Sequence, residues 1–337
     1  MTWIFIFVSL LLFVSLTIKL PDQKKPIDLI SPFLKNEKIL GINQWFPKYE
    51  ETYGNTVEID GNKLQITAKA ALFVDSKTGD VLYSKNAKDK LPIASLAKVM
   101  TALIALEHKS LNDNFLVSQR TTEMEPDEMI LIAGEHLTLR ELLYGIFMVS
   151  ANDAAEVLAE GTLRPFDKLR AQGEPGNRDE FIRLMNAKAK QLGMKDTYFV
   201  NPTGLDEDSN NSYSTAYDMA ILTRYLTRHF PEVVEISKTP YIFIPENKDH
   251  QSYEMWTGIN LLTTYPGVVG FKTGYTPEAG LVLITLARKD GSPRSAQSDA
   301  RGADGAGHEV IGVLLNSEYR RDEAKLLLDY SFKKLIQ

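Results

Sequence analysis

A serine and a lysine three positions apart, Ser95 and Lys98, are the residues of this sequence best suited to chemistry. They interrupt an apolar run at 91–106, a pattern typical of a helix buried inside a domain. On a helix, a spacing of three places both side chains on one face, about one turn apart, so the hydroxyl and the amine can meet. Burial lowers the pKa of a lysine, and a neutral amine beside a serine hydroxyl is a general base beside a nucleophile.

Taken alone, the pair has a simpler interpretation. Ser95 then caps a helix that starts just after Pro92, and Lys98 extends its stem to water. The spacing alone does not decide between the two interpretations, so the rest of the chain has to.

A second polar group lies between two helical patterns, at 137–148 and 154–160. Ser150 and Asn152 occupy the short connection, where polar side chains can be directed into a cleft. On its own, this connection is equally an ordinary helix start, capped by Asn152 or Asp153.

A third group lies within a β-type run at 267–275, which contains Lys272 and Thr273. Gly274 comes next, and glycine within a strand allows another backbone or a ligand to come close.

The remaining patterns describe the elements that would position these groups. We expect a hairpin at 71–75 and 81–83 directly before the buried helix, and amphipathic helices at 180–192, 214–226 and 321–335. Apolar runs at 281–287 and 309–315 predict further strands of a sheet. Polar stretches rich in glycine, at 162–178 and 288–308, predict loop insertions.

Composition excludes several kinds of chemistry. A formal charge of -6 over 337 residues argues against nucleic-acid binding. The absence of cysteine excludes thiol catalysis, disulfides and thiolate metal sites. The five histidines are scattered, so we expect no metal site and a base other than histidine. We also expect no cofactor.

The N-terminal segment 1–18 has no charged side chain and would span about 27 Å as a helix, enough for a membrane anchor or a signal sequence. No basic leader and no small-residue cleavage site are visible before Pro21, which favours an uncleaved anchor. We therefore expect an anchor or signal segment at 1–20, a linker at 21–65 and one domain at 66–337.

Ser95-x-x-Lys98, Ser150-x-Asn152 and Lys272-Thr273-Gly274, in this order on helix, connection and strand, match a motif set of class A β-lactamases and penicillin-binding proteins. With its flanking residues, including those at 201–206 and 214–218, the chain resembles the low-molecular-weight penicillin-binding proteins of the serine D-alanyl-D-alanine carboxypeptidase family. The resemblance implies an α/β sandwich of the β-lactamase/transpeptidase type, with an antiparallel sheet covered by helices and a helical subdomain that carries Ser150 and Asn152.

The resemblance also implies acyl transfer on peptidoglycan stem peptides ending in D-Ala-D-Ala, at the outer face of a bacterial membrane, with β-lactams as inhibitors. Ser95 would be the nucleophile and Lys98 its base. The N–H groups of Ser95 and Tyr275 would form the oxyanion hole. Other roles would be proton relay by Ser150, orientation of the substrate or Lys98 by Asn152, and binding of the terminal carboxylate by Lys272 and Thr273.

Rival functions share the same motifs. An endopeptidase that cuts cross-links performs the same reaction with a longer leaving group, so the motifs do not separate the two. A β-lactamase would need a glutamate that activates the deacylating water, and no suitable Glu-x-x-x-Asn loop lies between Asn152 and Lys272. A non-enzymatic cell-wall-binding or β-lactam-sensing protein would leave the intact Ser95–Lys98 pair without a purpose.

Overall fold

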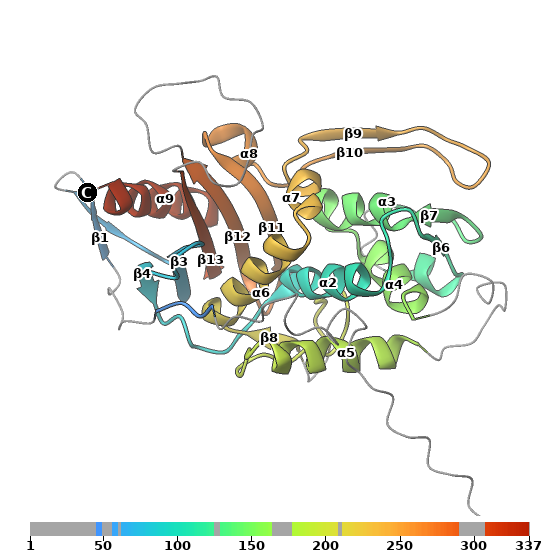
Figure 1. The fold of residues 1–337 in the computed structure, drawn as a ribbon, viewed down its shortest axis with the longest axis horizontal. Helices are drawn as coiled ribbons and strands as arrows, with labels where there is room; N and C mark the ends of the chain where they lie inside the picture. The colour runs from blue at the N-terminus through green and yellow to red at the C-terminus, as the bar shows by residue number, and fades with distance from the viewer. Residues whose placement is uncertain are drawn as a thin grey trace, which may run out of the picture.

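A five-stranded antiparallel sheet organises the molecule (Figure 1). The computed structural model describes residues 45–48, 56–59, 62–124, 129–163, 177–207, 211–289 and 307–336. The strands follow the order β11-β12-β13-β3-β4, and every neighbouring pair is antiparallel. Their bounds are Val268–Thr276 for β11, Gly280–Lys289 for β12, His308–Ser317 for β13, Ala70–Asp75 for β3 and Val81–Lys85 for β4.

Helices cover both faces of this sheet, so its strands are buried on both sides. Along β3, alternate residues enter two different apolar clusters: Leu72 and Val74 belong to the larger one, and Ala71 and Phe73 to the smaller one. Helix α9 (Arg320–Ile336) covers the smaller cluster, and α6 (Ala216–His229) and α7 (Glu232–Ser237) cover the other face. The predicted α/β sandwich with an antiparallel sheet is confirmed.

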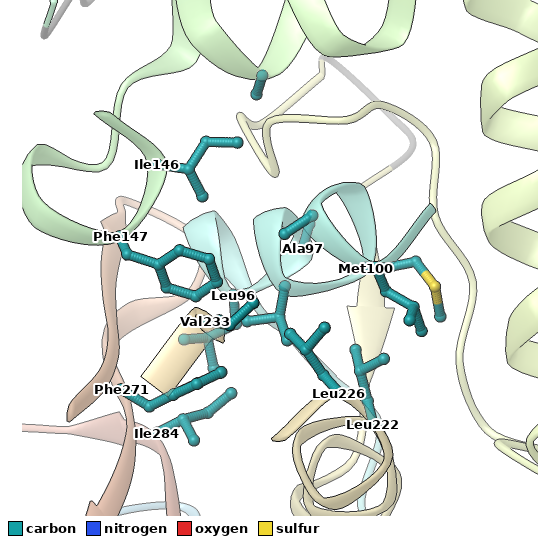
Figure 2. Packing of buried hydrophobic residues seen from close by; sticks show 14 of the residues in the cluster. Leu96, Ala97, Met100, Ile146, Phe147, Leu222, Leu226, Val233, Phe271 and Ile284 are labelled. Atoms are coloured by element: carbon teal, nitrogen blue, oxygen red, sulfur yellow. The ribbon is translucent and has the colours of Figure 1, made fainter. Parts of the chain in front are cut away.

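A helical part lies beside the sheet and shares its larger core (Figure 1). It comprises α2 (Lys98–His108), α3 (Leu139–Tyr144), the π-helical turn η4 (Gly145–Val149), α4 (Asn152–Gly161) and α5 (Arg178–Gln191). Figure 2 shows how this core continues around the start of α2: Leu96 lies among Phe147 from η4, Phe271 from β11 and Val233 from α7. The residues next to the predicted nucleophile are therefore held by packing from several elements.

The remaining elements are short. They are the 3-10 turns η2 (Ala94–Ala97) and η3 (Arg120–Glu123), the helical turn α8 (Leu261–Thr264), and the strand pairs β1 (Thr56–Ile59) with β2 (Asn62–Gln65), β5 (Leu91–Pro92) with β8 (Tyr213–Ser214), β6 (Asn114–Leu116) with β7 (His136–Thr138), and β9 (Tyr241–Ile244) with β10 (Tyr253–Trp256).

The prediction of one continuous helix at 91–106 is wrong at its start. Leu91 and Pro92 pair with β8, a 3-10 turn follows at Ala94–Ala97, and the α-helix begins only at Lys98. The apolar run does not reveal this break, because the composition stays apolar through all three segments although Leu91 and Pro92 are only partly buried. The helix predicted at 137–148 also starts late, since Thr138 and Glu141 form a capping box that sets its first turn.

Part of the expected linker at 21–65 contacts the domain. Val57 of the β1–β2 hairpin is buried in the cluster under α9, and Lys48 forms an ion pair with Asp80. The expected anchor at 1–18 and the cores of the two expected insertions, 164–176 and 290–306, lie outside the described residues. Within the described part of the chain, no helix combines the length and apolar character needed to cross a bilayer.

Candidate active site

Ser95 and Lys98 meet at the junction of η2 and α2. The Lys98 Nζ lies 2.9 Å from the Ser95 Oγ. A 3-10 turn has three residues per turn, so positions i and i+3 lie directly above one another. The contact predicted between Ser95 and Lys98 therefore forms although this segment is not α-helical. Ala94, just before the serine, has a φ of 46°, a conformation that costs a residue with a Cβ about 1–3 kcal/mol and is found at functional sites.

Lys98 is completely buried, with 0% of its surface exposed, and polar atoms surround its Nζ. Besides Ser95, the amine lies 2.7 Å from the Asn152 Oδ1 and 2.7 Å from the Thr203 carbonyl oxygen. Both of these oxygens can only accept hydrogen bonds. A neutral amine that donates its two N–H groups to them directs its lone pair at the remaining partner, the Ser95 hydroxyl. The arrangement can therefore remove the serine proton.

Ser150 and Lys272 form the second contact of the site. The Lys272 Nζ donates to the Ser150 Oγ at 2.8 Å and to the Thr273 carbonyl at 2.7 Å, and Lys272 is also 0% exposed. Ser150 ends the η4 turn in a left-handed conformation with a φ of 66°, which directs the chain into α4 and places Asn152 at the start of that helix. The Lys272 amine is thus held, inside the protein, against the Ser150 hydroxyl.

Strand β11 lies directly against the turn that carries Ser95. A Cβ added at Gly274 would lie 2.9 Å from the Ser95 backbone nitrogen and 3.3 Å from the Ala94 Cβ. The close backbone approach predicted at Gly274 is thus an approach to Ser95. Tyr275, the next residue, has 61% of its surface exposed.

The structure thus brings residues of the three predicted motifs together in two groups. Ser95, Lys98 and Asn152 form one group, and Ser150 and Lys272 form the other. Thr273, the residue after Lys272 on β11, lies near Gly258. A Cβ added at Gly258 would be 4.0 Å from the Thr273 Oγ1.

Sequence reasoning missed the Thr203 carbonyl and the role of Gly204. The residues at 201–206 contributed to the family resemblance, but this did not indicate a contact with Lys98. Gly204 has a φ of +78°, and a Cβ there would lie 1.9 Å from the Ala94 carbonyl oxygen. The Thr101 Oγ1 also donates to the Pro202 carbonyl at 2.6 Å, which fixes this loop to α2.

Arg320 is a further residue that the sequence did not reveal. Its Nη1 donates to the Gly274 carbonyl at 2.5 Å and to the Val282 carbonyl at 3.1 Å. It lines a cavity of about 310 Å³ together with Thr273, Gly258 and Tyr319. The start of the last amphipathic helix gave no signal that this arginine faces the site.

Comparison with known proteins gives a consistent family. Residues 56–296 match the peptidase S11 family, D-alanyl-D-alanine carboxypeptidase. The chain is 36% identical over 233 residues to D-alanyl-D-alanine carboxypeptidase DacF of Bacillus subtilis, covering 68% of this chain and 56% of that protein. It is 34% identical over 234 residues to a D-alanyl-D-alanine endopeptidase of Pseudomonas aeruginosa, covering 68% and 70% of the two chains.

A solved structure has the same fold. Penicillin-binding protein D2 from Listeria monocytogenes, in the ampicillin-bound form, superposes with a TM-score of 0.62 at 30% identity, covering 80% of this chain and 99% of that one. The family resemblance predicted from the three motifs is confirmed. By its sequence match and its fold, this chain belongs to the D-alanyl-D-alanine carboxypeptidase family of serine peptidases.

Proposed function

We propose that this protein removes the terminal D-alanine from peptidoglycan stem peptides through an acyl-enzyme on Ser95. The observation that carries the proposal is the buried Lys98 amine, 2.9 Å from the Ser95 hydroxyl and held by Asn152 and the Thr203 carbonyl. Among the contacts described for this group none is to a histidine, and we assign the role of base to Lys98.

In the acylation step, the Ser95 Oγ attacks the carbonyl carbon of the penultimate D-alanine and its proton passes to the Lys98 Nζ. Negative charge develops on the carbonyl oxygen, where the N–H groups of Ser95 and Tyr275 would stabilise it. The C–N bond then breaks, and the proton that Lys98 accepted passes through Ser150 to the leaving amine of D-alanine, which leaves Lys98 neutral again.

In the deacylation step, water attacks the ester carbonyl while Lys98 accepts a proton from the water. Lys98 returns this proton to the Ser95 Oγ as the ester bond breaks, so the shortened peptide leaves and the Ser95 hydroxyl is restored. In this proposal Lys272 contributes the positive potential that attracts the substrate carboxylate, and Thr273 would donate a hydrogen bond to it. Arg320 adds a second cation on the Thr273 side of β11.

Cleavage of cross-links is the second candidate. The endopeptidase of Pseudomonas aeruginosa, 34% identical to this chain, favours it, and the cavity beside Thr273 offers room for a leaving group larger than D-alanine.

Residues 1–18 would anchor the protein, so the enzyme would work on the outer face of the cell membrane, where peptidoglycan lies. Separation of membrane and soluble fractions tests the anchor.

A fluorescent penicillin tests the central claim. The full-length wild type should gain a lasting label that is absent in Ser95→Ala and unchanged in a control, Ser252→Ala, on the β9–β10 connection. Release of D-alanine from a free stem peptide, compared with cleavage of a cross-linked dimer, then separates the two peptidase activities. A folded wild type without label would contradict the acyl-enzyme, and rapid turnover of penicillin would indicate a β-lactamase.

A further inference from the structure

The β9–β10 hairpin carries exposed aromatic side chains on one face only. In register, Trp256 faces Tyr241 and Glu254 faces Phe243. These four residues form what we call the outer hairpin face, and its aromatic members are 67%, 40% and 54% exposed for Trp256, Tyr241 and Phe243. The residues between them point the other way, toward the protein. Exposed aromatic groups of this kind mark interaction sites on proteins.

The outer hairpin face begins next to the active site. Trp256 is two residues from Gly258, whose backbone N–H donates to the Met148 carbonyl at 2.8 Å and which lies close to the Thr273 Oγ1. Two residues span at most about 7 Å. From there the hairpin extends across the helical part of the molecule (Figure 1). A polymer bound at the active site can therefore continue onto this face.

The hairpin is held rigidly at its far end. Glu135 accepts a hydrogen bond from the Gln251 N–H at 2.8 Å and one from the Tyr253 hydroxyl, and the His136 N–H donates to the Asp249 carbonyl at 2.9 Å. A surface fixed at both ends loses little conformational freedom on binding. It is preformed for a ligand.

The chemistry of the face fits a sugar. The Tyr241 and Trp256 rings lie 4.4 Å apart between centroids and are tilted by 43°, which gives a broad apolar surface. Pyranose rings present C–H groups that stack on such surfaces. Glu254 accepts a hydrogen bond from the Tyr241 hydroxyl at 3.1 Å, and its carboxylate can also accept from sugar hydroxyl or acetamido N–H groups.

The charge of the hairpin does not favour an anionic bilayer. Glu246, Asp249 and Glu254 are exposed along it, against one exposed lysine, Lys248. Anionic lipids attract basic segments, not acidic ones. We propose that the outer hairpin face binds the glycan strand of peptidoglycan, next to the stem peptide that is cut. This inference rests on the proposed function and identifies a second part of the same substrate.

The test compares two substrates on the full-length protein. One is a free stem peptide ending in D-Ala-D-Ala, and the other is the same peptide attached to its disaccharide of N-acetylated hexosamines. Trp256→Ala should lower kcat/KM about three- to tenfold on the disaccharide substrate, the size expected for a lost aromatic contact, and leave the free peptide unchanged. Trp256→Phe should restore most of the difference. Tyr198→Ala, an exposed aromatic residue elsewhere, is the matched control.

Binding can also be measured without catalysis. Wild type should co-sediment with glycan strands freed of their stem peptides, and Trp256→Ala should do so several times less. Equal loss on both substrates, or no loss of glycan binding, would overturn the inference. Reduced binding of Trp256→Ala to phosphatidylcholine vesicles alone would overturn it in favour of a membrane contact. Failure of the acyl-enzyme instead appears as an unlabelled wild type, whatever the glycan result.

Discussion

The Lys98 Nζ and the Asn152 Oδ1, 54 positions apart in sequence, lie 2.7 Å from each other inside the protein. Because the amide oxygen is neutral, it holds the amine without favouring the ammonium as strongly as a carboxylate would. Asn152 therefore fits a lysine that has to accept a proton from Ser95.

Replacing this amide by a carboxylate tests that interpretation. Asn152→Asp should favour the charged ammonium of Lys98, so acylation by a fluorescent penicillin should need a higher pH. Near neutral pH, we expect labelling to be at least about tenfold slower, which corresponds to ~1.4 kcal/mol. Asn152→Ala is the control, because it removes the contact without adding charge. It should slow acylation at every pH and leave the shape of the pH profile unchanged.

A profile of Asn152→Asp that coincides with the wild type would show that Lys98 is not the base. Thermal unfolding of each variant separates an effect on chemistry from a loss of fold.

Gly204, in the loop that faces Lys98, and Gly134, elsewhere in the chain, both have a positive φ, so alanine substitutions at the two positions can be compared. A Cβ at Gly204 would collide with the Ala94 carbonyl oxygen at 1.9 Å, whereas Gly134, with a φ of +95°, has nothing within 4 Å. Gly134→Ala should cost only the backbone strain, about 1–2 kcal/mol, and keep penicillin labelling. Gly204→Ala should cost at least about 3 kcal/mol and slow labelling, since the Ala94 and Thr203 carbonyls would move. Urea unfolding and labelling rates measure both effects. Equal behaviour of the two variants would show that the collision is relieved elsewhere.

The sequence was sufficient for the chemistry-bearing residues because their types are unusual where they occur. The sequence alone shows a serine and a lysine inside an apolar run. It also shows a lysine two residues before a glycine in a strand. The Thr203 carbonyl was not predictable, because every residue has a backbone carbonyl and only the folded loop determines which one faces Lys98. The 3-10 turn around Ser95 was hidden for a similar reason, since burial and not local propensity keeps Ala94 at a positive φ.

The β9–β10 hairpin was missed for a different reason. Its strands have only four residues each, and residues 245–252 separate them, which is longer than the tight turns that identify hairpins in sequence. Its position is set by contacts at its far end, such as that between Glu135 and Gln251, which no local pattern reveals.

Glu156 and Glu160 offer a comparison of a buried and a partly exposed carboxylate that share one arginine. Glu156 is fully buried and pairs with Arg120 at 2.6 Å and Arg178 at 2.9 Å, whereas Glu160, 20% exposed, pairs only with Arg120 among the ion pairs seen. Glu156→Gln should destabilise the fold by at least about 2 kcal/mol, because Arg120 and Arg178 would both lose the buried carboxylate with which they pair. Glu160→Gln should cost less than about 1 kcal/mol. Chemical unfolding gives both values, and a reversed order would contradict the importance of burial here.

Asp218, in the first turn of α6, should make stability depend on pH in an unusual direction. Burial raises the pKa of its carboxyl above the ordinary value, although hydrogen bonds from Thr197 and the Asp196 N–H oppose the shift. As the pH falls through this raised value toward about 3.8, the folded protein takes up the proton before the unfolded chain does, which stabilises the fold. Relative to Asp218→Asn, which cannot titrate, the wild type should therefore gain free energy of unfolding over that window. Urea unfolding of both proteins from neutral pH down to about 4 measures the difference. A wild type that instead loses stability relative to Asp218→Asn as the pH falls would mean that the hydrogen bonds outweigh burial and that the pKa is lowered.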